Sequence, residues 1–277
     1  MVQVVVQLKD NEIDTTRTVL ASSLLGDLVP ICYGALTKAQ FAYVSRFIPG
    51  TVWALQEGHF SVDTNARIAR QVGSLLARCT LGLDSSAIVN RYIIPRLNRT
   101  IAKADMPDDL RKYVREFVKF SKDLESLPLA LSHADVNSMN LILNENAEIV
   151  GLIDWELAQL LPVGMNAWCI VRLSFTNRNR VDYASEKTQP MAEAFWNGFV
   201  SSLPGNTQKN SANIVKAMKI GLIFDQFGEG YVPDPRDVAM TLGRLEWIEN
   251  TFSSLRVADP EGKILNFLRQ KHLIACA

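Results

Sequence analysis

The feature that most constrains the fold is a stretch of short apolar runs, separated by polar turns, between residues 129 and 156. Residues 129–133 (LALSH) and 141–144 (LILN) have the length and composition of short β-strands, and residues 148–154 (EIVGLID) of a third. The turn at 145–147 (ENA) is short enough to join the second and third strands as a hairpin. Such a hairpin brings the start of one strand beside the end of the other.

Three polar residues lie at the open end of this predicted hairpin. Asn140 directly precedes its first strand, Asp154 ends its second strand, and Asp135 lies in the polar loop that leads to it. Carboxylate and amide oxygens suit Mg²⁺, and a loop carboxylate can orient or accept the proton of an attacking hydroxyl. We expect His133 to brace the loop by hydrogen bonding. The alternative is that Asp135 and Asn140 only form turns and caps, which such residues favour.

The flanking segments predict an α+β fold with two lobes. Residues 2–9 are rich in β-branched side chains typical of a strand, and a helix and two more short strands follow before Pro49-Gly50. Beyond that point, amphipathic patterns typical of helices dominate. We therefore expect a small β-rich lobe at 1–50 and a large, mainly helical lobe at 51–277, with a ligand site in the cleft between them.

Composition argues against several other classes of protein. Basic and acidic residues are equal in number, 29 each, whereas a broad nucleic-acid surface needs a basic excess. No apolar run reaches the roughly 18 residues that cross a bilayer, and the start lacks the basic segment of a signal peptide. The four cysteines are scattered without a CxxC pair, which argues against zinc. We expect a cytoplasmic protein with no membrane or nucleic-acid partner; the oligomeric state is not indicated.

The residues HADVNSMN (133–140) and LIDWE (152–156) resemble a known pair of signatures. They are similar to the H-x-D-x-x-x-x-N and D-W-E motifs of the aminoglycoside phosphotransferase and choline kinase-like family, and to the corresponding elements of protein kinases. The longer run through DWELAQLLPVGMNAW resembles uncharacterised fungal members of that family. The resemblance implies a two-lobed protein-kinase-like fold that uses ATP and Mg²⁺ to phosphorylate a hydroxyl of a small molecule.

The resemblance also implies a role for each matching residue. Asp135 would be the catalytic base, while Asn140 and Asp154 would bind Mg²⁺. Glu156 would reach a second metal ion or the substrate. The strand that ends at residue 47 takes the place of the hinge between the lobes. The positions whose backbone would hold adenine there are Ser45 and Phe47.

The predicted nucleotide clamp departs from the family pattern. The family clamp begins with two strands joined by a phosphate-covering loop, whereas the first predicted strand here starts at residue 2. That strand resembles the one that carries the phosphate-pairing lysine. Lys9 is the candidate, although Gln7 lies on the same face of the strand and could take the inward place. The following helix, residues 15–25, contains no glutamate to pair with the lysine.

Two functional hypotheses follow. The first is ATP- and Mg²⁺-dependent phosphorylation of a small-molecule hydroxyl. The second is a catalytically weak or inactive kinase-like protein that binds a ligand or partner, because the missing loop would supply backbone donors and exclude water. A truncated N-terminus in the gene model would produce the same pattern, with a small lobe that only looks incomplete.

Overall fold

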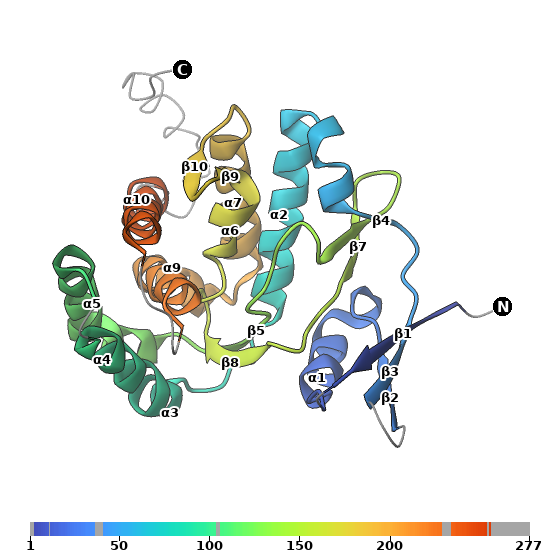
Figure 1. Ribbon diagram of the computed structural model, residues 1–277, viewed down its shortest axis with the longest axis horizontal. Coiled ribbons are helices and arrows are strands. Elements are labelled where there is room, and N and C mark those ends of the chain that lie inside the picture. The colour runs from blue at the N-terminus through green and yellow to red at the C-terminus, as the bar shows by residue number, and fades with distance from the viewer. Residues whose placement is uncertain are drawn as a thin grey trace.

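The computed structural model describes residues 3–10, 12–36, 41–103, 106–228, 234–253 and 255. Figure 1 shows a small lobe, formed by strands β1 to β3 and helix α1, beside a larger lobe made mainly of helices. The α+β architecture predicted from the sequence is therefore confirmed. The end of the predicted helical lobe, residues 256–277, lies outside the described residues.

The small lobe is built on a three-stranded antiparallel sheet. Its order is β1 (Val4–Lys9), β3 (Phe41–Arg46) and β2 (Cys32–Leu36), so β3 is central. Helix α1 (Thr16–Leu25) ends at Gly26, whose φ of 65° is a left-handed conformation that glycine adopts without strain. Strand β1 forms an edge of the sheet, and three of its apolar side chains are more than half exposed: Val4, Val6 and Leu8.

The segment between the lobes enters the sheet that carries the predicted hairpin. Strand β4 (Thr51–Val52) pairs with β6 (Leu141–Leu143), which pairs in turn with β7 (Ile149–Leu152). Gly50 immediately precedes β4 and has a φ of 148°, and a Cβ at this position would lie 2.5 Å from the Leu143 carbonyl oxygen. The close approach of the linker to β6 therefore depends on glycine at residue 50.

The hairpin has its turn where the sequence predicts it. The side-chain oxygen Oδ1 of Asn144 accepts hydrogen bonds from the backbone N–H groups of Asn146 and Glu148, at 3.0 and 2.9 Å. Asparagine side chains commonly close turns in this way. The strand predicted at 129–133 forms as β5 (Leu129–Ser132), but it pairs with β8 (Gln159–Pro162) rather than with the hairpin.

Helices α2 (Val62–Arg78) and α7 (Thr188–Ser202) pack closely side by side in the large lobe. The backbones touch because glycine stands at the contact on both helices. A Cβ at Gly73 would lie 2.2 Å from the carbonyl oxygen of Phe195, and one at Gly198 would lie 2.1 Å from that of Arg70. Ser61 caps the start of α2 by accepting a hydrogen bond from the Thr64 N–H at 3.2 Å.

The other α-helices of the large lobe pack in smaller groups. They are α3 (Ser86–Ile88), a π-helical turn (Val89–Ile93) leading into α4 (Ile94–Ala102), α5 (Asp108–Phe120), α6 (Cys169–Ser174), α8 (Gly205–Gln208), α9 (Ser211–Gln226) and α10 (Pro235–Phe252). Helix α6 lies against α7, α9 against α10, and α4 against α5, which Figure 1 shows on the side of the lobe away from α2. A short hairpin, β9 (Thr176–Arg178) with β10 (Val181–Tyr183), follows α6. Among the described helices, none has the length and apolar composition to cross a membrane.

Candidate active site

The loop between β5 and β6 carries Asp135 and is held in place by His133. The His133 ring is fully buried; its Nε2–H donates to the Ile153 carbonyl at 2.7 Å, and its Nδ1 accepts the Asp135 N–H at 3.3 Å. Burial lowers the pKa of His133 to about 4, so the ring is neutral near pH 7. The edge of the ring also packs on Trp155, with centroids 4.6 Å apart.

The backbone of this loop needs a conformation that is costly for most residues. Ala134, which stands where the usual H-G-D motif has glycine, has a φ of 68°. The left-handed region costs a residue with a Cβ about 1 kcal/mol relative to glycine. The replacement of glycine by alanine therefore strains the loop, and the buried His133 contacts hold it in place.

Asn140 joins the loop to the hairpin. Its Nδ2 donates to the carbonyl oxygen of Asp135 at 2.8 Å and to the Asp135 carboxylate Oδ2 at 3.2 Å. The backbone carbonyl of Asn140 accepts a hydrogen bond from the N–H of Ile153 at 3.0 Å, and Ile153 directly precedes Asp154. Because the amide nitrogen contacts Asp135, the amide oxygen is directed away from it. Asn140 and Asp154 therefore lie at the same end of the hairpin as Asp135.

Asp154 follows β7 with a φ of 68°, and its carboxyl group lies among other negative charges. Burial raises the pKa of Asp154, the nearby carboxylates of Glu156 and Asp135 raise it further, and the Lys9 ammonium opposes them. A divalent cation would relieve this repulsion. The described residues contain no group of three or more His, Cys, Asp or Glu arranged for a metal. Asn140 and Asp154 carry an amide oxygen and a carboxylate, which are the kinds of oxygen donor that Mg²⁺ prefers.

Lys9 reaches from the small lobe to this end of the hairpin. Its Nζ lies 3.0 Å from Oε2 of Glu156, and both side chains are about one third exposed. Of the two residues that could face the site, Lys9 contacts the D-W-E segment. Helix α1 supplies no acid, and Glu156 occupies the position of an acidic partner for the lysine. A pocket of about 440 Å³ lies beside the pair, lined by Lys9, Asp10, Glu12, Ile13, Asp14, Glu156 and Leu157.

The two residues predicted to hold adenine lie in the small-lobe sheet or at its end. Ser45 lies within the central strand β3, opposite Val5 on one side and Cys32 on the other, so its backbone is part of the sheet. The N–H of Phe47, predicted to hold adenine, donates to the carbonyl of Gln3 at 3.1 Å. The pairing of β1 with β3 therefore extends to residue 47 and occupies this donor.

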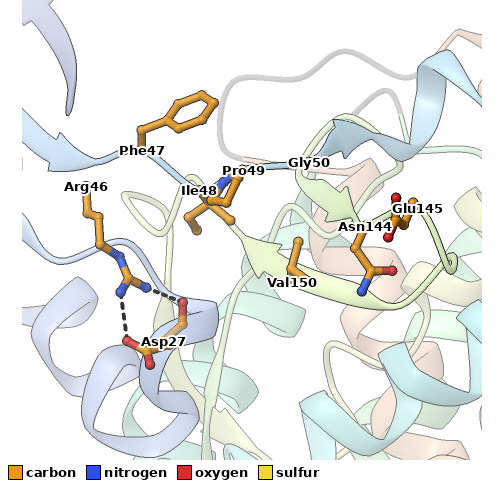
Figure 2. A pocket seen from close by; sticks show the side chains of 9 residues that line it. All are labelled: Asp27, Arg46, Phe47, Ile48, Pro49, Gly50, Asn144, Glu145 and Val150. Atoms are coloured by element: carbon orange, nitrogen blue, oxygen red, sulfur yellow. Dashed lines mark hydrogen bonds and ion pairs between the residues drawn. The ribbon is translucent and has the colours of Figure 1, made fainter. Parts of the chain in front are cut away.

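The hinge also borders a second pocket, of about 640 Å³. Figure 2 shows its lining, which combines the hinge with the turn of the β6–β7 hairpin: Asp27, Arg46, Phe47, Ile48, Pro49, Gly50, Asn144, Glu145 and Val150. The Arg46 guanidinium is tied to Asp27, with Nη1 2.8 Å from the carboxylate. Because the turn is the opposite end of the hairpin from Asn140 and Asp154, we do not assign this pocket to a nucleotide that reaches those residues.

One residue at the site carries no sequence signal. Arg172, on α6, lies against Asp135 with Nη1 2.6 Å from Oδ1, although 37 positions separate the two. The same guanidinium contacts Asp225 on α9 through Nη2, 3.1 Å from each carboxylate oxygen. No spacing or motif links three residues on a loop and two helices, so only the tertiary structure shows this cluster.

Comparison with protein families agrees with the geometry. The profile of the phosphotransferase enzyme family matches residues 16–189, more than half of the chain. The chain belongs to this family. Family membership confirms the resemblance noted from residues 133–156 and makes the protein a small-molecule phosphotransferase by class. A search of curated protein sequences gave no significant match.

Several solved structures share the fold at low sequence identity. A choline/ethanolamine kinase family protein from Mesorhizobium loti is 13% identical, with a TM-score of 0.56 over 90% of this chain and 82% of that one. An ethanolamine kinase from Plasmodium vivax is 14% identical, with a TM-score of 0.52 over 89% and 76%. A type I macrolide 2'-phosphotransferase is 12% identical, with a TM-score of 0.52 over 87% and 83%. The protein-kinase-like fold is therefore confirmed.

Proposed function

We propose that the protein transfers the terminal phosphate of ATP to a hydroxyl group of a small molecule, with Mg²⁺ as cofactor. The observation that carries the proposal is the meeting of Asp135, Asn140 and Asp154 at one end of the β6–β7 hairpin. Solved relatives named as ethanolamine kinase and macrolide 2'-phosphotransferase act on small molecules, which agrees with this class of acceptor.

Each of these residues would have its own role in the reaction. Asp135 orients the acceptor hydroxyl and takes its proton as the hydroxyl oxygen bonds to the terminal phosphorus and the bond to the ADP oxygen breaks. Asn140 and Asp154 would hold Mg²⁺, which when bound offsets charge on the phosphates. Asn140 also fixes the Asp135 carboxylate through its Nδ2 contact at 3.2 Å. His133 keeps the loop in the conformation that presents Asp135.

Lys9 is the proposed phosphate ligand, and Glu156 its positioning residue. Kinases of this fold commonly hold such a lysine with a helical glutamate. Here the acid comes from the D-W-E segment, 3.0 Å from the lysine Nζ. A bound phosphate would therefore share the Lys9 ammonium with the Glu156 carboxylate. Glu156 in this arrangement replaces the missing helical acid, as well as remaining a candidate for a second metal ion.

A catalytically weak or inactive protein remains the second candidate, favoured by two observations. The Phe47 N–H is already bound to Gln3, and the pocket beside Lys9 carries four carboxylate side chains against one ammonium. Such a pocket repels phosphate unless a cation accompanies it. On this hypothesis the fold would bind a ligand without turning it over.

Thermal unfolding with ATP and turnover of ATP separate the two candidates. A ligand at 100 times its Kd stabilises the folded state by about 2.7 kcal/mol. We expect ATP with Mg²⁺ to raise the Tm of wild type and of Asp135→Asn, but to raise that of Asp154→Asn far less.

Turnover should fall by about 10²-fold or more in Asp135→Asn, because the hydroxyl loses its orienting base. Asp109→Asn, an exposed change on α5, serves as the matched control and should behave as wild type. Equal ADP release by wild type and Asp135→Asn would remove Asp135 from this role. Nucleotide binding without ADP release in either would favour the inactive candidate.

A further inference from the structure

The guanidinium of Arg172 joins the loop that carries Asp135 to helix α9. Its Nη1 lies 2.6 Å from Oδ1 of Asp135, and its Nη2 lies 3.1 Å from each carboxylate oxygen of Asp225. Asp225 stands one residue before the end of α9, and its side chain is 19% exposed, against 35% for that of Asp135. One cation therefore serves two carboxylates, the proposed base and a more deeply buried acid on a helix.

The two helices determine where this guanidinium lies. Its Cζ is 4.7 Å from the centroid of the Trp168 ring, which is buried and stands one turn earlier along α6, and this cation–π contact limits its movement. On α9, Gln226 donates a hydrogen bond at 2.5 Å to Oδ2 of Asp225 and so limits the rotation of the carboxylate that holds Nη2. The position of Nη1 therefore follows from the packing of α6 and α9.

The Asp135 carboxylate is held at both of its oxygens. Oδ1 accepts from Nη1 of Arg172, and Oδ2 accepts from Nδ2 of Asn140 at 3.2 Å. One contact comes from the helical lobe and the other from the hairpin, so the plane of the carboxylate is set from two sides. Each oxygen keeps lone-pair capacity for the hydroxyl of an acceptor. A base that is oriented in advance needs no further ordering when the acceptor binds.

Asp225 occupies a place that is unfavourable for a carboxylate. Burial raises the pKa of Asp225, and the charge of Arg172, the hydrogen bond from Gln226 and the charge of Arg244 oppose this effect. The last turn of α9, where Asp225 stands, is also the end of a helix whose dipole disfavours negative charge. Without this carboxylate, Nη2 would lose its ionic partner and the guanidinium could turn away from Asp135.

We infer that Asp225 and Arg172 are positioning residues: Asp225 anchors the guanidinium, and the guanidinium orients the Asp135 carboxylate. The inference rests on the proposed function, because it takes Asp135 as the base that meets the acceptor hydroxyl. An ion pair that only joined α6 to α9 would stabilise the fold without changing the turnover of folded molecules.

ADP release from ATP and Mg²⁺ tests this role, with water as the acceptor in place of an alcohol. The water oxygen bonds to the terminal phosphorus, its proton passes to Asp135, and the bond to the ADP oxygen breaks. We expect Asp225→Asn to lower kcat by about tenfold or more, because small misplacements of a reacting group cost up to about 10²-fold. The KM for ATP should stay within about twofold of the wild-type value, because Asp225 does not contact the proposed nucleotide ligands.

Two further comparisons separate positioning from a structural role. Arg172→Lys keeps the charge but lacks the fork that reaches both carboxylates, so it should lower kcat as Asp225→Asn does. In an Asp135→Asn background, neither change should lower kcat further, because each acts only through the missing carboxylate. Glu249→Gln is the matched control, because it also removes the acid of an ion pair made by α9, with Lys219, and it should leave kcat unchanged.

Amide hydrogen exchange of residues 133–140 gives a measurement that needs no turnover. Exchange in this loop should be about threefold faster or more in Asp225→Asn than in wild type, because the loop loses its connection to α9. Exchange in Glu249→Gln should match that of wild type.

Each outcome separates the inference from the function on which it rests. A loss of kcat in Asp225→Asn that is equally large in the Asp135→Asn background, wild-type kcat in Arg172→Lys, or unchanged loop exchange would overturn the positioning role while the phosphotransferase proposal stands. Absence of both the ATP-induced rise in Tm and ADP release in wild type would overturn the proposed function, and loop exchange would still decide whether Asp225 holds the loop.

Discussion

Replacing Gly73 by alanine should destabilise the protein, although alanine is the better helix former. Gly73 lies inside α2, where a change from glycine to alanine is ordinarily worth about 1 kcal/mol of added stability. The structure predicts a loss of stability instead. A Cβ at this position would lie 2.2 Å from the Phe195 carbonyl oxygen and 2.9 Å from the Phe199 nitrogen, both backbone atoms of α7.

The magnitude follows from the distance that the helices must move. Ordinary contact for a Cβ begins at 3.4 Å, so α2 and α7 would have to separate by about 1.2 Å, the difference between 3.4 and 2.2 Å. Overpacking of this kind typically costs about 1–3 kcal/mol, and sometimes more. Since backbone atoms cannot rotate aside, we place the cost at the upper end. After the gain in helix propensity, the net loss is about 2 kcal/mol, or about 4–8 °C in Tm.

Urea unfolding followed by circular dichroism gives the free energy of unfolding, and the chain offers its own control. Gly243 lies in α10 with an exposed side, and a Cβ there meets nothing within 4 Å. Gly243→Ala should gain about 0.5–1 kcal/mol. Gly198→Ala should resemble Gly73→Ala, and the double variant should cost less than the sum, because one separation of the helices serves both. A gain in stability for Gly73→Ala equal to that for Gly243→Ala would refute the reasoning.

Two further predictions concern the loop that carries Asp135. The pKa of His133 is about 4 when folded and about 6.5 when unfolded, so protonation favours unfolding. The stability that neutral His133 gives the folded state is fully present above pH 6.5 and is lost as the pH falls toward 4, by up to about 3 kcal/mol. The amide of Gln in His133→Gln can still donate to Ile153 but does not titrate. This variant should therefore lose that part of the pH dependence of the free energy of unfolding, measured by urea unfolding at several pH values. Ala134→Gly should raise the free energy of unfolding by about 0.5–1 kcal/mol, since glycine adopts the φ of 68° without strain, and a lower urea midpoint would contradict that account.

Much of the fold could be predicted because local patterns and the tertiary structure agree. The strand at the start, the helix that ends at Gly26 and the hairpin with its turn at 145–147 all depend on neighbouring residues, and all form as predicted. The segment 85–100 (SSAIVNRYIIPRLNRT) cannot be assigned from the sequence, because its β-branched residues and Pro95 contradict a regular helix. The structure resolves the conflict with a π-helical turn, after which Pro95 stands in the first turn of α4, where it loses no helical hydrogen bond.

Parts of the candidate site were hidden for a different reason. Motif spacing predicts that Asn140 and Asp154 share one end of the hairpin, because strand pairing determines it. The contact of Arg172 with Asp135 instead depends on how α6 packs over the loop, and the occupied N–H of Phe47 depends on how far β1 extends. Both contacts depend on tertiary packing, which cannot be predicted from the residue pattern of one segment.

The entry of the linker into the hairpin sheet links the hinge to the proposed Mg²⁺ site. Strand β4 follows the hinge directly and hydrogen-bonds to β6, the strand that begins after Asn140. A rotation of the small lobe therefore pulls on the strand that positions a proposed Mg²⁺ ligand. A side chain at residue 50 would press on the Leu143 carbonyl at 2.5 Å and displace the same strand. Lobe orientation and metal affinity should accordingly change together, even when the altered residue touches no ligand.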